Sequence, residues 1–292
     1  MKIGALEAGG TKMVCAVGDE TGKFTDRVSI PTESPEITMP KLIEYFKSRD
    51  VEALGIGCFG PIDLNRKSET YGYILKTTKL KWIDFDFLGT MKKELDIPMG
   101  FDTDVNGSVL GEVTFGQAKG LDTVVYITIG TGVGAGVYIN GRLLHGAAHP
   151  EAGHILMIRH PKDTYEGWCP YHGICLEGMA SGSAMKDRWG RPASELTDND
   201  LAWEIEADYL AQAITAFIYT YAPQKIIIGG GVMHSPGLFE RIHSEVLKKD
   251  NHYASVKELD DIKNYIVLPS LNDDQGLMGA LALGYEAAKE SR

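Results

Sequence analysis

Along the first 30 residues, apolar positions alternate with other positions, and this period of two predicts β-strands. We expect three short strands at residues 2–8, 11–18 and 23–30, with glycine-rich turns between them. From residue 35 to residue 49 the apolar residues follow helical spacing instead, which predicts a helix. A buried strand, VEALGIGC, follows, and helices and strands then alternate to about residue 115. The first part of the chain therefore has the β-β-β-α-β-α-β-α order of an α/β layer.

The same opening pattern returns later in the chain. Residues 123–141, TVVYITIGTGVGAGVYING, again have the pattern strand, glycine-rich turn, strand. A helix is expected at about residues 197–221, then the strand KIIIGGGV, a helix, the strand YIVLPS and a final helix from Gln275. The repeat predicts two related α/β halves. Within the second half, residues 146–178 have no regular period and carry Cys, His, Pro and Gly, which indicates an insertion with its own chemistry.

Composition and charge narrow the class of protein. A chain of 292 residues has the length of two ordinary domains, and its 43% hydrophobic and 24% charged residues are typical of a globular protein. The net charge of −11 argues against nucleic acid as a partner, because phosphate backbones bind basic surfaces. No apolar run reaches the ~18 residues of a membrane helix, and no secretory signal is seen. Four cysteines make no disulfide framework, so we expect a cytoplasmic protein without membrane contact.

Two glycine turns, EAGGTK and TIGTGVGAG, each open one of the predicted halves. Glycine lets a backbone approach a ligand closely, and concave groups of backbone N–H donors hold phosphates. The hydroxyls of Thr128 and Thr131 add further donors in the second turn. Either turn alone fits a plain tight hairpin equally well, but two in equivalent places favour phosphate binding. The candidate phosphate-binding residues are Gly9, Gly10, Thr11, Lys12, Thr131, Gly132 and Gly134.

A third cluster, CPYHGIC, places Cys169, His172 and Cys175 at intervals of three residues. Three soft ligands in one short loop suit Zn²⁺, whose structural sites take four ligands. The fourth ligand has to come from another segment. The alternative interpretation is a pair of reduced cysteines beside a surface histidine.

Several of these motifs together resemble the ROK family of sugar kinases, and the opening EAGGTK and the Cys/His loop are most similar to its bacterial zinc-containing fructokinase branch. The motifs occur in the family's order from residue 2 to about residue 280: EAGGTK, GIGCFGPID, TDVNGSVLGE, TIGTGVGAG, HPEAGHI, CLEGMASG and IIIGGGV. The resemblance implies the actin-like ATPase fold, with two ribonuclease-H-like domains, ATP and sugar in the cleft between them, and a zinc-bearing insertion. We expect an N-terminal domain at residues 1–116, completed by 275–292, and a C-terminal domain at 117–274 with the zinc loop at 145–178. The resemblance also implies a homodimer.

The resemblance assigns roles to individual residues. Asp104, in TDVNG, matches the family's catalytic base, although Thr103 replaces the usual Asn. A carboxylate at the end of a strand can accept the proton of a sugar hydroxyl. The alternative is that Asp104 only caps a helix beginning near Asn106. The implied sugar-binding residues are Gly60, Pro61, Asp104, Glu151, His154 and Glu177, together with Asn106 or its neighbours.

The resemblance also implies the ligands. Gly229, Gly230 and Gly231 resemble the family's adenosine contact, so ATP is the expected nucleotide, with Mg²⁺ on its phosphates and Glu7 as a candidate to hold that ion through water. His154 is expected as the fourth ligand of a structural zinc, with His145, His149 and His160 as competitors. The loop departs from the family's Cys-x-Cys-Gly-x-x-Gly-Cys pattern in spacing and in its use of His172. An ordinary helix N-terminal carboxylate remains the alternative role for Glu177.

These observations predict an ATP-dependent kinase that converts D-fructose to fructose 6-phosphate. Glucokinase, mannokinase and N-acylhexosamine kinase activities are the near alternatives, because residues outside the motifs decide the hexose. A transcriptional regulator of the same family would carry an N-terminal helix-turn-helix, yet the first strand is predicted at Lys2 in an acidic chain. A sugar-binding protein without catalysis would be expected to lack Asp104 or one phosphate turn.

Overall fold

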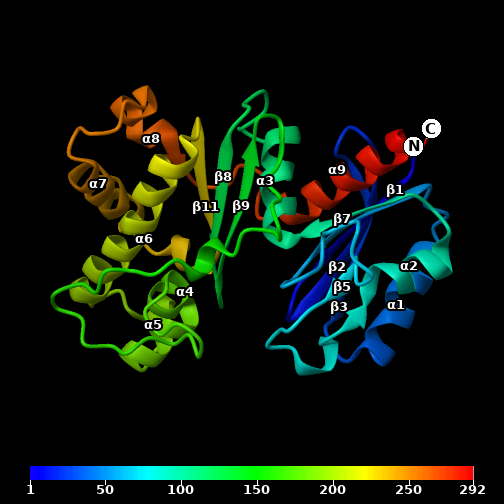
Figure 1. Cartoon of the computed structure of the whole chain (residues 1–292), viewed down its shortest axis with the longest axis horizontal. Helices are drawn as coiled ribbons and strands as arrows, with labels where there is room; N and C mark the ends of the chain where they lie inside the picture. Colours follow the sequence, from blue (N-terminus) through cyan, green and yellow to red (C-terminus); the bar gives the residue numbers. More distant parts are fainter. Residues whose placement is uncertain (292) are drawn as a thin grey trace. The chain divides into compact units, whose positions relative to one another are not determined.

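The computed structural model describes residues 1–291, which group into two compact units (Figure 1). Unit 1 contains Met1–Gly120, Leu143–Pro150 and the chain from Ser270 onward, and unit 2 contains Leu121–Arg142 and Glu151–Pro269. The short segment Leu143–Pro150 thus groups with unit 1, although the zinc loop was expected to begin at residue 145 within the C-terminal domain. The expected domain boundaries remain a prediction.

A five-stranded sheet with the order β3-β2-β1-β4-β7 is the centre of unit 1. Its strands are β1 (Ile3–Ala8), β2 (Lys12–Gly18), β3 (Phe24–Pro31), β4 (Ala53–Cys58) and β7 (Met99–Thr103). The first three strands are antiparallel, whereas β4 and β7 run parallel to β1. The three predicted opening strands are confirmed to within one residue at each end.

Alternation along these strands builds two cores, one on each face of the sheet. Leu6 of β1 packs in a core with side chains of α1 (Pro35–Lys47) and α2 (Phe87–Leu95). Ile3 and Ala5 belong to a separate core with α9 (Gln275–Glu290). Successive side chains of a strand point to opposite faces of the sheet. Because nearly every residue of β1 and β2 is buried, both faces of the sheet are covered.

Helices α3 (Asp104–Thr114) and α9 pack very closely in unit 1 (Figure 1). Gly279 of α9 lies so near α3 that a Cβ atom on it would be 1.6 Å from the carbonyl oxygen of Gly107. Helix α9 also packs against β1, β4 and β7 of the N-terminal sheet, and it begins at Gln275 as predicted.

Unit 2 repeats the strand order of unit 1. Its sheet has the order β10-β9-β8-β11-β12, so that counted along the chain both sheets read 3-2-1-4-5. The strands are β8 (Val124–Ile129), β9 (Val133–Ile139), β10 (Arg142–Leu143), β11 (Lys225–Gly229) and β12 (Ile266–Val267). Strands β8 and β9 are antiparallel, and β11 and β12 are parallel to β8. The shared order supports the duplication predicted from the two glycine turns.

The helices of unit 2 include α6, which is buried along most of its length and packs against α4 and α7. They are α4 (Leu176–Ala180), α5 (Gly182–Trp189), α6 (Asp200–Tyr221), α7 (Leu238–Asp250) and α8 (Ile262–Tyr265).

Short 3-10 turns lie at Leu80–Trp82 (η1), Ala152–His154 (η2), Ala193–Glu195 (η3), Gly231–His234 (η4) and Lys257–Asp261 (η5). None of the helices within residues 1–291 has the length and apolar character needed to span a bilayer.

Two expectations about helix starts need correction, and one element was not predicted. The helix after β7 begins at Asp104, not near Asn106, because Thr103 supplies the cap. Helix α6 begins at Asp200 instead of about residue 197, since Asn199 caps it by accepting a hydrogen bond from the Ala202 backbone N–H. A two-stranded ribbon of β5 (Tyr73–Ile74) and β6 (Phe85–Asp86) was not predicted, because strands of two residues carry no period.

Candidate active site and metal centre

The first glycine turn is held rigidly at the edge of the sheet in unit 1. It joins β1 to β2, and the Gly9 N–H donates to the Lys12 carbonyl at 3.1 Å. Thr32 fastens the turn from β3, because its hydroxyl donates to the Gly9 carbonyl at 2.7 Å and its N–H donates to the Thr11 carbonyl at 3.0 Å. These hydrogen bonds define the shape of the turn at the end of β1.

The side chain of Lys79 lies over this turn. The sequence did not predict this contact. A Cβ atom on Gly10 would be 2.9 Å from Lys79 Cε and 3.8 Å from its Nζ, so glycine leaves the space that the lysine occupies. Lys12 is exposed beside it. Two ammonium groups at one glycine turn are the chemistry that binds phosphate oxygens.

The second glycine turn, in unit 2, has a different support. The N–H of Gly182, the first residue of α5, donates to the Gly130 carbonyl at 2.8 Å, and the Ser183 hydroxyl donates to the Thr131 carbonyl at 2.8 Å. The turn thus lies at the N-terminus of a helix, where backbone N–H groups and the helix dipole favour anions. Sequence reasoning did not select Gly182 and Ser183, and the only signal was the run of small residues in MASGSA.

The triple glycine follows β11, as predicted. Gly230 has a φ angle of 95°, a conformation that favours glycine, and Gly231 starts the turn η4. A pocket of about 290 Å³ borders Gly231, and its wall also includes Trp203, His234 and Arg241. A mixed apolar and polar pocket next to a backbone turn fits a nucleoside.

Asp104 is the first residue of α3 and follows the parallel strand β7 directly. The cap of this helix is Thr103, whose hydroxyl oxygen accepts a hydrogen bond from the Asn106 N–H at 3.1 Å. The interpretation of Asp104 as the capping residue is therefore wrong. Its carboxylate instead accepts a hydrogen bond from the next backbone N–H, that of Val105, at 2.8 Å.

Glu7, at the end of β1, shares the electrostatic environment of Asp104. Burial raises the pKa of Glu7 to about 7, and the negative charges of Asp104 and Asp274 act in the same direction. A set of carboxylates that repel one another fits a divalent cation, and oxygen donors of this kind are what Mg²⁺ prefers. Asp274 is already paired with Arg27, with 2.7 Å between Oδ1 and Nη1, so Glu7, the residue named from the sequence, stays the candidate donor for such an ion.

The residues expected at the sugar are divided between the units. Gly60 and Pro61, joined by a cis peptide bond, follow β4, and Asp104 follows β7. Strands β4 and β7 are parallel neighbours, with Cys58 opposite Thr103, so both sets lie at the same edge of one sheet. In unit 2, Glu151 is exposed, His154 ends η2 and Glu177 lies in α4.

Four side chains of unit 2 come together as the predicted metal centre. The ligand atoms of His154, Cys169, His172 and Cys175 all lie within 4.8 Å of one another. His154 Nδ1 is 3.8 Å from Cys169 Sγ and 3.5 Å from Cys175 Sγ, and Cys169 Sγ is 3.6 Å from His172 Nδ1. Zinc bonds of 2.0–2.3 Å in a tetrahedron give edges of roughly 3.3–3.8 Å, so the donor set and its spacing fit zinc.

The competing histidines have other partners. His145 bonds to Asp102, His149 to the backbone of Ile62, and His160 lies beside Glu204. The geometry therefore favours His154 as the fourth ligand. Burial raises the pKa of the Cys175 thiol to about 11, and a bound cation reverses that effect by stabilising the thiolate.

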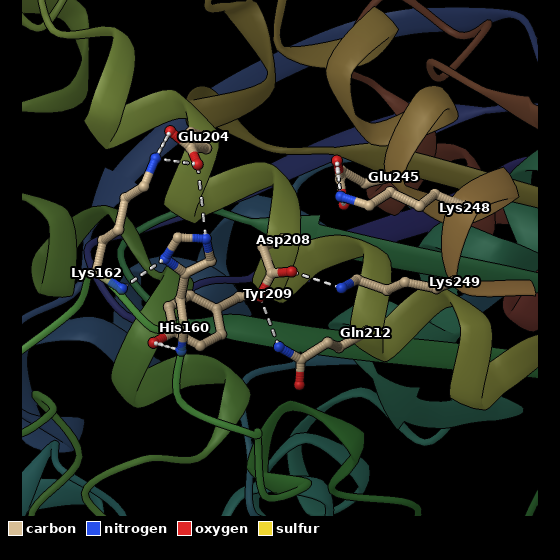
Figure 2. Close-up of polar contacts among 9 residues, drawn as sticks. All are labelled: His160, Lys162, Glu204, Asp208, Tyr209, Gln212, Glu245, Lys248 and Lys249. Atoms are coloured by element: carbon tan, nitrogen blue, oxygen red, sulfur yellow. Dashed lines mark hydrogen bonds and ion pairs between the residues drawn. The ribbon is translucent and has the colours of Figure 1, made fainter.

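Side chains of α6 bind the segment that precedes Cys169, at His160 and Lys162 (Figure 2). The His160 N–H donates to the Tyr209 hydroxyl oxygen at 3.1 Å, and Lys162 Nζ donates to both carboxylate oxygens of Glu204 at 2.7 and 2.9 Å. Both partners project from α6, as Figure 2 shows. This segment lacks a regular period, and its position is set by side chains of a helix more than 40 residues away.

Comparisons with known proteins agree with this arrangement. The ROK family profile matches residues 3–287. The chain is 51% identical over 286 residues to a Bacillus subtilis (strain 168) relative, covering 98% of this chain and 96% of the relative. It is 45% identical over 291 residues to the fructokinase of Pediococcus pentosaceus, covering both chains completely. Among solved structures, the ROK hexokinase of Thermus thermophilus superposes with a TM-score of 0.82 at 25% identity, covering 99% of this chain and 100% of that one. The duplicated sheets, the two glycine turns and this full-length similarity lead to one conclusion: the chain belongs to the ROK family of actin-like ATPase fold.

Proposed function

We propose that this protein is an ATP-dependent fructokinase that transfers the γ-phosphoryl group of ATP to D-fructose and forms fructose 6-phosphate. The observation that carries the kinase proposal is Asp104, a carboxylate at the C-terminal end of a parallel strand that is not needed as a helix cap. The full-length relatives of Pediococcus pentosaceus, Streptococcus mutans and Zymomonas mobilis, at 41–45% identity, are named fructokinases, which supports fructose as the hexose.

Each part of the reaction has candidate residues in the chain. Asp104 accepts the proton of the attacking hydroxyl, as a general base does. The candidates for the phosphates are the two glycine turns, with Lys12 and Lys79 at the first and the α5 N-terminus at the second. Gly229, Gly230 and Gly231, with the pocket beside them, are the candidates for the adenosine. Glu7 is our candidate to hold the magnesium ion of Mg-ATP, which would neutralise charge on the phosphates.

The sugar site that we propose comprises Gly60, Pro61, Asp104, Asn106, Glu151, His154 and Glu177. Carboxylates and imidazoles recognise sugar hydroxyls by hydrogen bonding, and such sites reject analogues that lack the hydroxyl. His154 is proposed to serve two purposes. Its Nδ1 faces the two cysteine sulfurs, so its Nε2 is left for the sugar.

We further propose that the cluster of His154, Cys169, His172 and Cys175 binds one structural zinc. The four soft donors are spaced as a tetrahedral ion requires. A fixed loop places Glu177, which follows Cys175 by two residues, and it orients the His154 ring. We also propose a homodimer, on the family resemblance alone, and a location in the cytoplasm, which the small number of cysteines favours.

A coupled assay with Mg-ATP over a panel of hexoses tests the function. We expect phosphorylation of fructose with a higher kcat/KM than glucose, mannose or N-acetylmannosamine. An equal or higher kcat/KM on glucose contradicts the choice of hexose and leaves the kinase assignment standing. Failure on every hexose, with sugar binding retained, contradicts the kinase assignment and favours a non-catalytic sugar-binding protein.

A further inference from the structure

The segment Leu143–Pro150 leaves unit 2 after β10, packs with unit 1, and returns to unit 2 at Glu151. We propose that this segment, here named the histidine strap, positions the sugar-binding residues of unit 1, and that His149 is its principal positioning residue. The inference rests on the proposed function, because that function assigns the sugar to Gly60, Pro61 and Asn106.

His149 fixes the loop that carries Gly60 and Pro61. Its side chain is buried, with the residue 8% exposed, and its Nε2 accepts a hydrogen bond from the Ile62 backbone N–H at 3.2 Å. Its ring also lies against Gly60, where a Cβ atom would be 3.5 Å from His149 Cε1. One imidazole therefore contacts the loop immediately before and after Pro61.

The same loop also contacts β5 and the residue that follows it. The Leu75 N–H donates to the Pro61 carbonyl at 2.8 Å, and Ile62 forms a β-bridge with Ile74. The Gly60–Pro61 loop is thus bonded both to the chain at β5 and to a histidine 87 residues from Ile62, all within unit 1. Without His149 the loop loses the acceptor of the Ile62 N–H and the ring that packs against Gly60.

The hydrogen bond specifies the form of His149. Because Nε2 accepts, it carries no proton, and the ring proton is on Nδ1. A residue that replaces His149 has to place an acceptor at the distance of Nε2. Glutamine reaches about that far with its amide oxygen, whereas asparagine is one carbon shorter, so the two amides differ in reach and share their polarity.

A second histidine attaches the strap to the start of α3. His145 Nε2 lies 2.8 Å from Asp102 Oδ2, and Asp102 is 3% exposed. The other oxygen, Oδ1, accepts hydrogen bonds from Asn106 Nδ2 at 2.7 Å and from the Thr103 N–H at 2.8 Å. A single buried carboxylate thus connects the strap to Asn106, two residues from Asp104.

The strap therefore holds both sugar-facing elements of unit 1, the loop after β4 and the first turn of α3. The first phosphate turn has its own support from Thr32. A substitution that removes the hydrogen bond of His149 should consequently weaken the binding of the sugar and leave the binding of ATP nearly unchanged. A residue that only stabilises the fold would not separate the two substrates in this way.

The test compares His149→Asn with His149→Gln in the full-length protein, with His252→Asn as a matched control at an exposed histidine. Steady-state kinetics give KM for fructose and for Mg-ATP, and thermal unfolding is measured in parallel. Hydrogen exchange of the Ile62 amide is followed by mass spectrometry or NMR, which reports on the contact itself whether or not the protein phosphorylates fructose.

We expect His149→Asn to raise KM for fructose about tenfold, the size of one lost buried hydrogen bond, with KM for ATP within twofold of wild type. The Ile62 amide should exchange faster in that variant, and His149→Gln should restore both values most of the way. Unchanged KM for fructose in a folded His149→Asn variant overturns the proposal, as does an equal rise in both KM values.

If His149→Asn does not fold, the His149→Gln variant decides the question. A near-normal KM for fructose with an Ile62 amide that is protected from exchange supports the strap. A tenfold rise in KM for fructose with that amide still protected overturns it. A wild-type protein that phosphorylates no hexose contradicts the proposed function, whereas the amide exchange still tests the strap.

Discussion

Glu177 Oε2 accepts a hydrogen bond from the Val133 backbone N–H at 3.0 Å. Glu177 follows Cys175 of the Cys/His cluster by two residues, and Val133 is the first residue of β9 after the second glycine turn. The fit is close, because a Cβ atom on Gly132 would be 2.5 Å from the same carboxylate oxygen. The loop that carries the Cys/His cluster and the second glycine turn are therefore connected by one side chain.

This connection predicts that loss of the metal weakens ATP binding. Cys175→Ser should lose about one equivalent of zinc, unfold at a lower temperature and raise KM for ATP, because the loop that carries Glu177 loses its anchor. Metal analysis of protein purified without chelator and steady-state kinetics measure these effects. His160→Gln, at a histidine outside the cluster, should retain its zinc. Full zinc content in Cys175→Ser would show that the metal is held elsewhere.

Glu177 itself allows a separate test. Glu177→Ala removes the acceptor for the Val133 N–H and should raise KM for ATP roughly tenfold, with zinc content unchanged, since a hydrogen bond of ~1–1.5 kcal/mol is lost. Glu177→Gln keeps an acceptor oxygen and should lie near wild type for ATP. The connection is refuted if the alanine variant binds ATP normally.

Asp104→Asn should lower kcat about 10²–10⁴-fold at saturating fructose and Mg-ATP, because asparagine cannot accept the proton. Thermal stability should hardly change, since Thr103 caps α3. Thr103→Ala is the stability control and should lower the free energy of unfolding by ~1 kcal/mol through the lost cap. A folded Asp104→Asn enzyme with near-normal kcat would remove Asp104 from the catalytic role.

Glu206 makes the stability of unit 2 depend on pH. It is fully buried in α6, neither carboxylate oxygen has a hydrogen-bond partner, and burial raises the pKa of Glu206 well above its usual value, an effect that Arg188 partly opposes. The folded state therefore keeps a proton that the unfolded state loses above about pH 4.5. The free energy of unfolding should fall as pH rises from there toward the folded-state pKa, by ~1.4 kcal/mol per pH unit at most.

Glu206→Gln should consequently unfold at a higher temperature than wild type at pH 8, and the difference should shrink toward pH 5. The control is Glu204→Gln, two residues away, where Lys162 lowers the pKa of an exposed carboxylate. That variant should show no gain at pH 8. Equal pH profiles for wild type and Glu206→Gln would mean that the Glu206 carboxylate is ionised in the folded protein.

Two glycines at the α3–α9 contact should respond oppositely to alanine. Gly279→Ala forces a methyl group to 1.6 Å from the Gly107 carbonyl oxygen and should lower the free energy of unfolding by roughly 1–3 kcal/mol or more. Gly107→Ala meets its nearest atom at 3.5 Å, an ordinary contact, and gains up to ~1 kcal/mol of helix propensity. Chemical denaturation of both variants measures the difference, and equal losses would contradict the close packing described for α9.

The sequence by itself determined those features that depend on neighbouring residues. Alternation located β1, β2 and β3, and the recurrence of a glycine turn revealed the duplication that the two equal strand orders support. The sequence also predicted the turns and the position of Asp104 after a strand, because a few neighbouring residues determine where strands end and turns form. The spacing of Cys169, His172 and Cys175 indicated a metal loop for the same reason.

The tertiary structure decided what depends on distant residues. Thr103, not Asp104, caps α3, because the exact residue at which the helix begins determines which oxygen reaches the Asn106 N–H. His154 joins the cysteines, while His149 and His145 turn to Ile62 and Asp102 in unit 1. No local pattern distinguishes these histidines, since each is an isolated ring in an irregular segment. Contacts across 15 to 87 residues give them their different roles, and only the packed chain brings those partners within hydrogen-bonding distance.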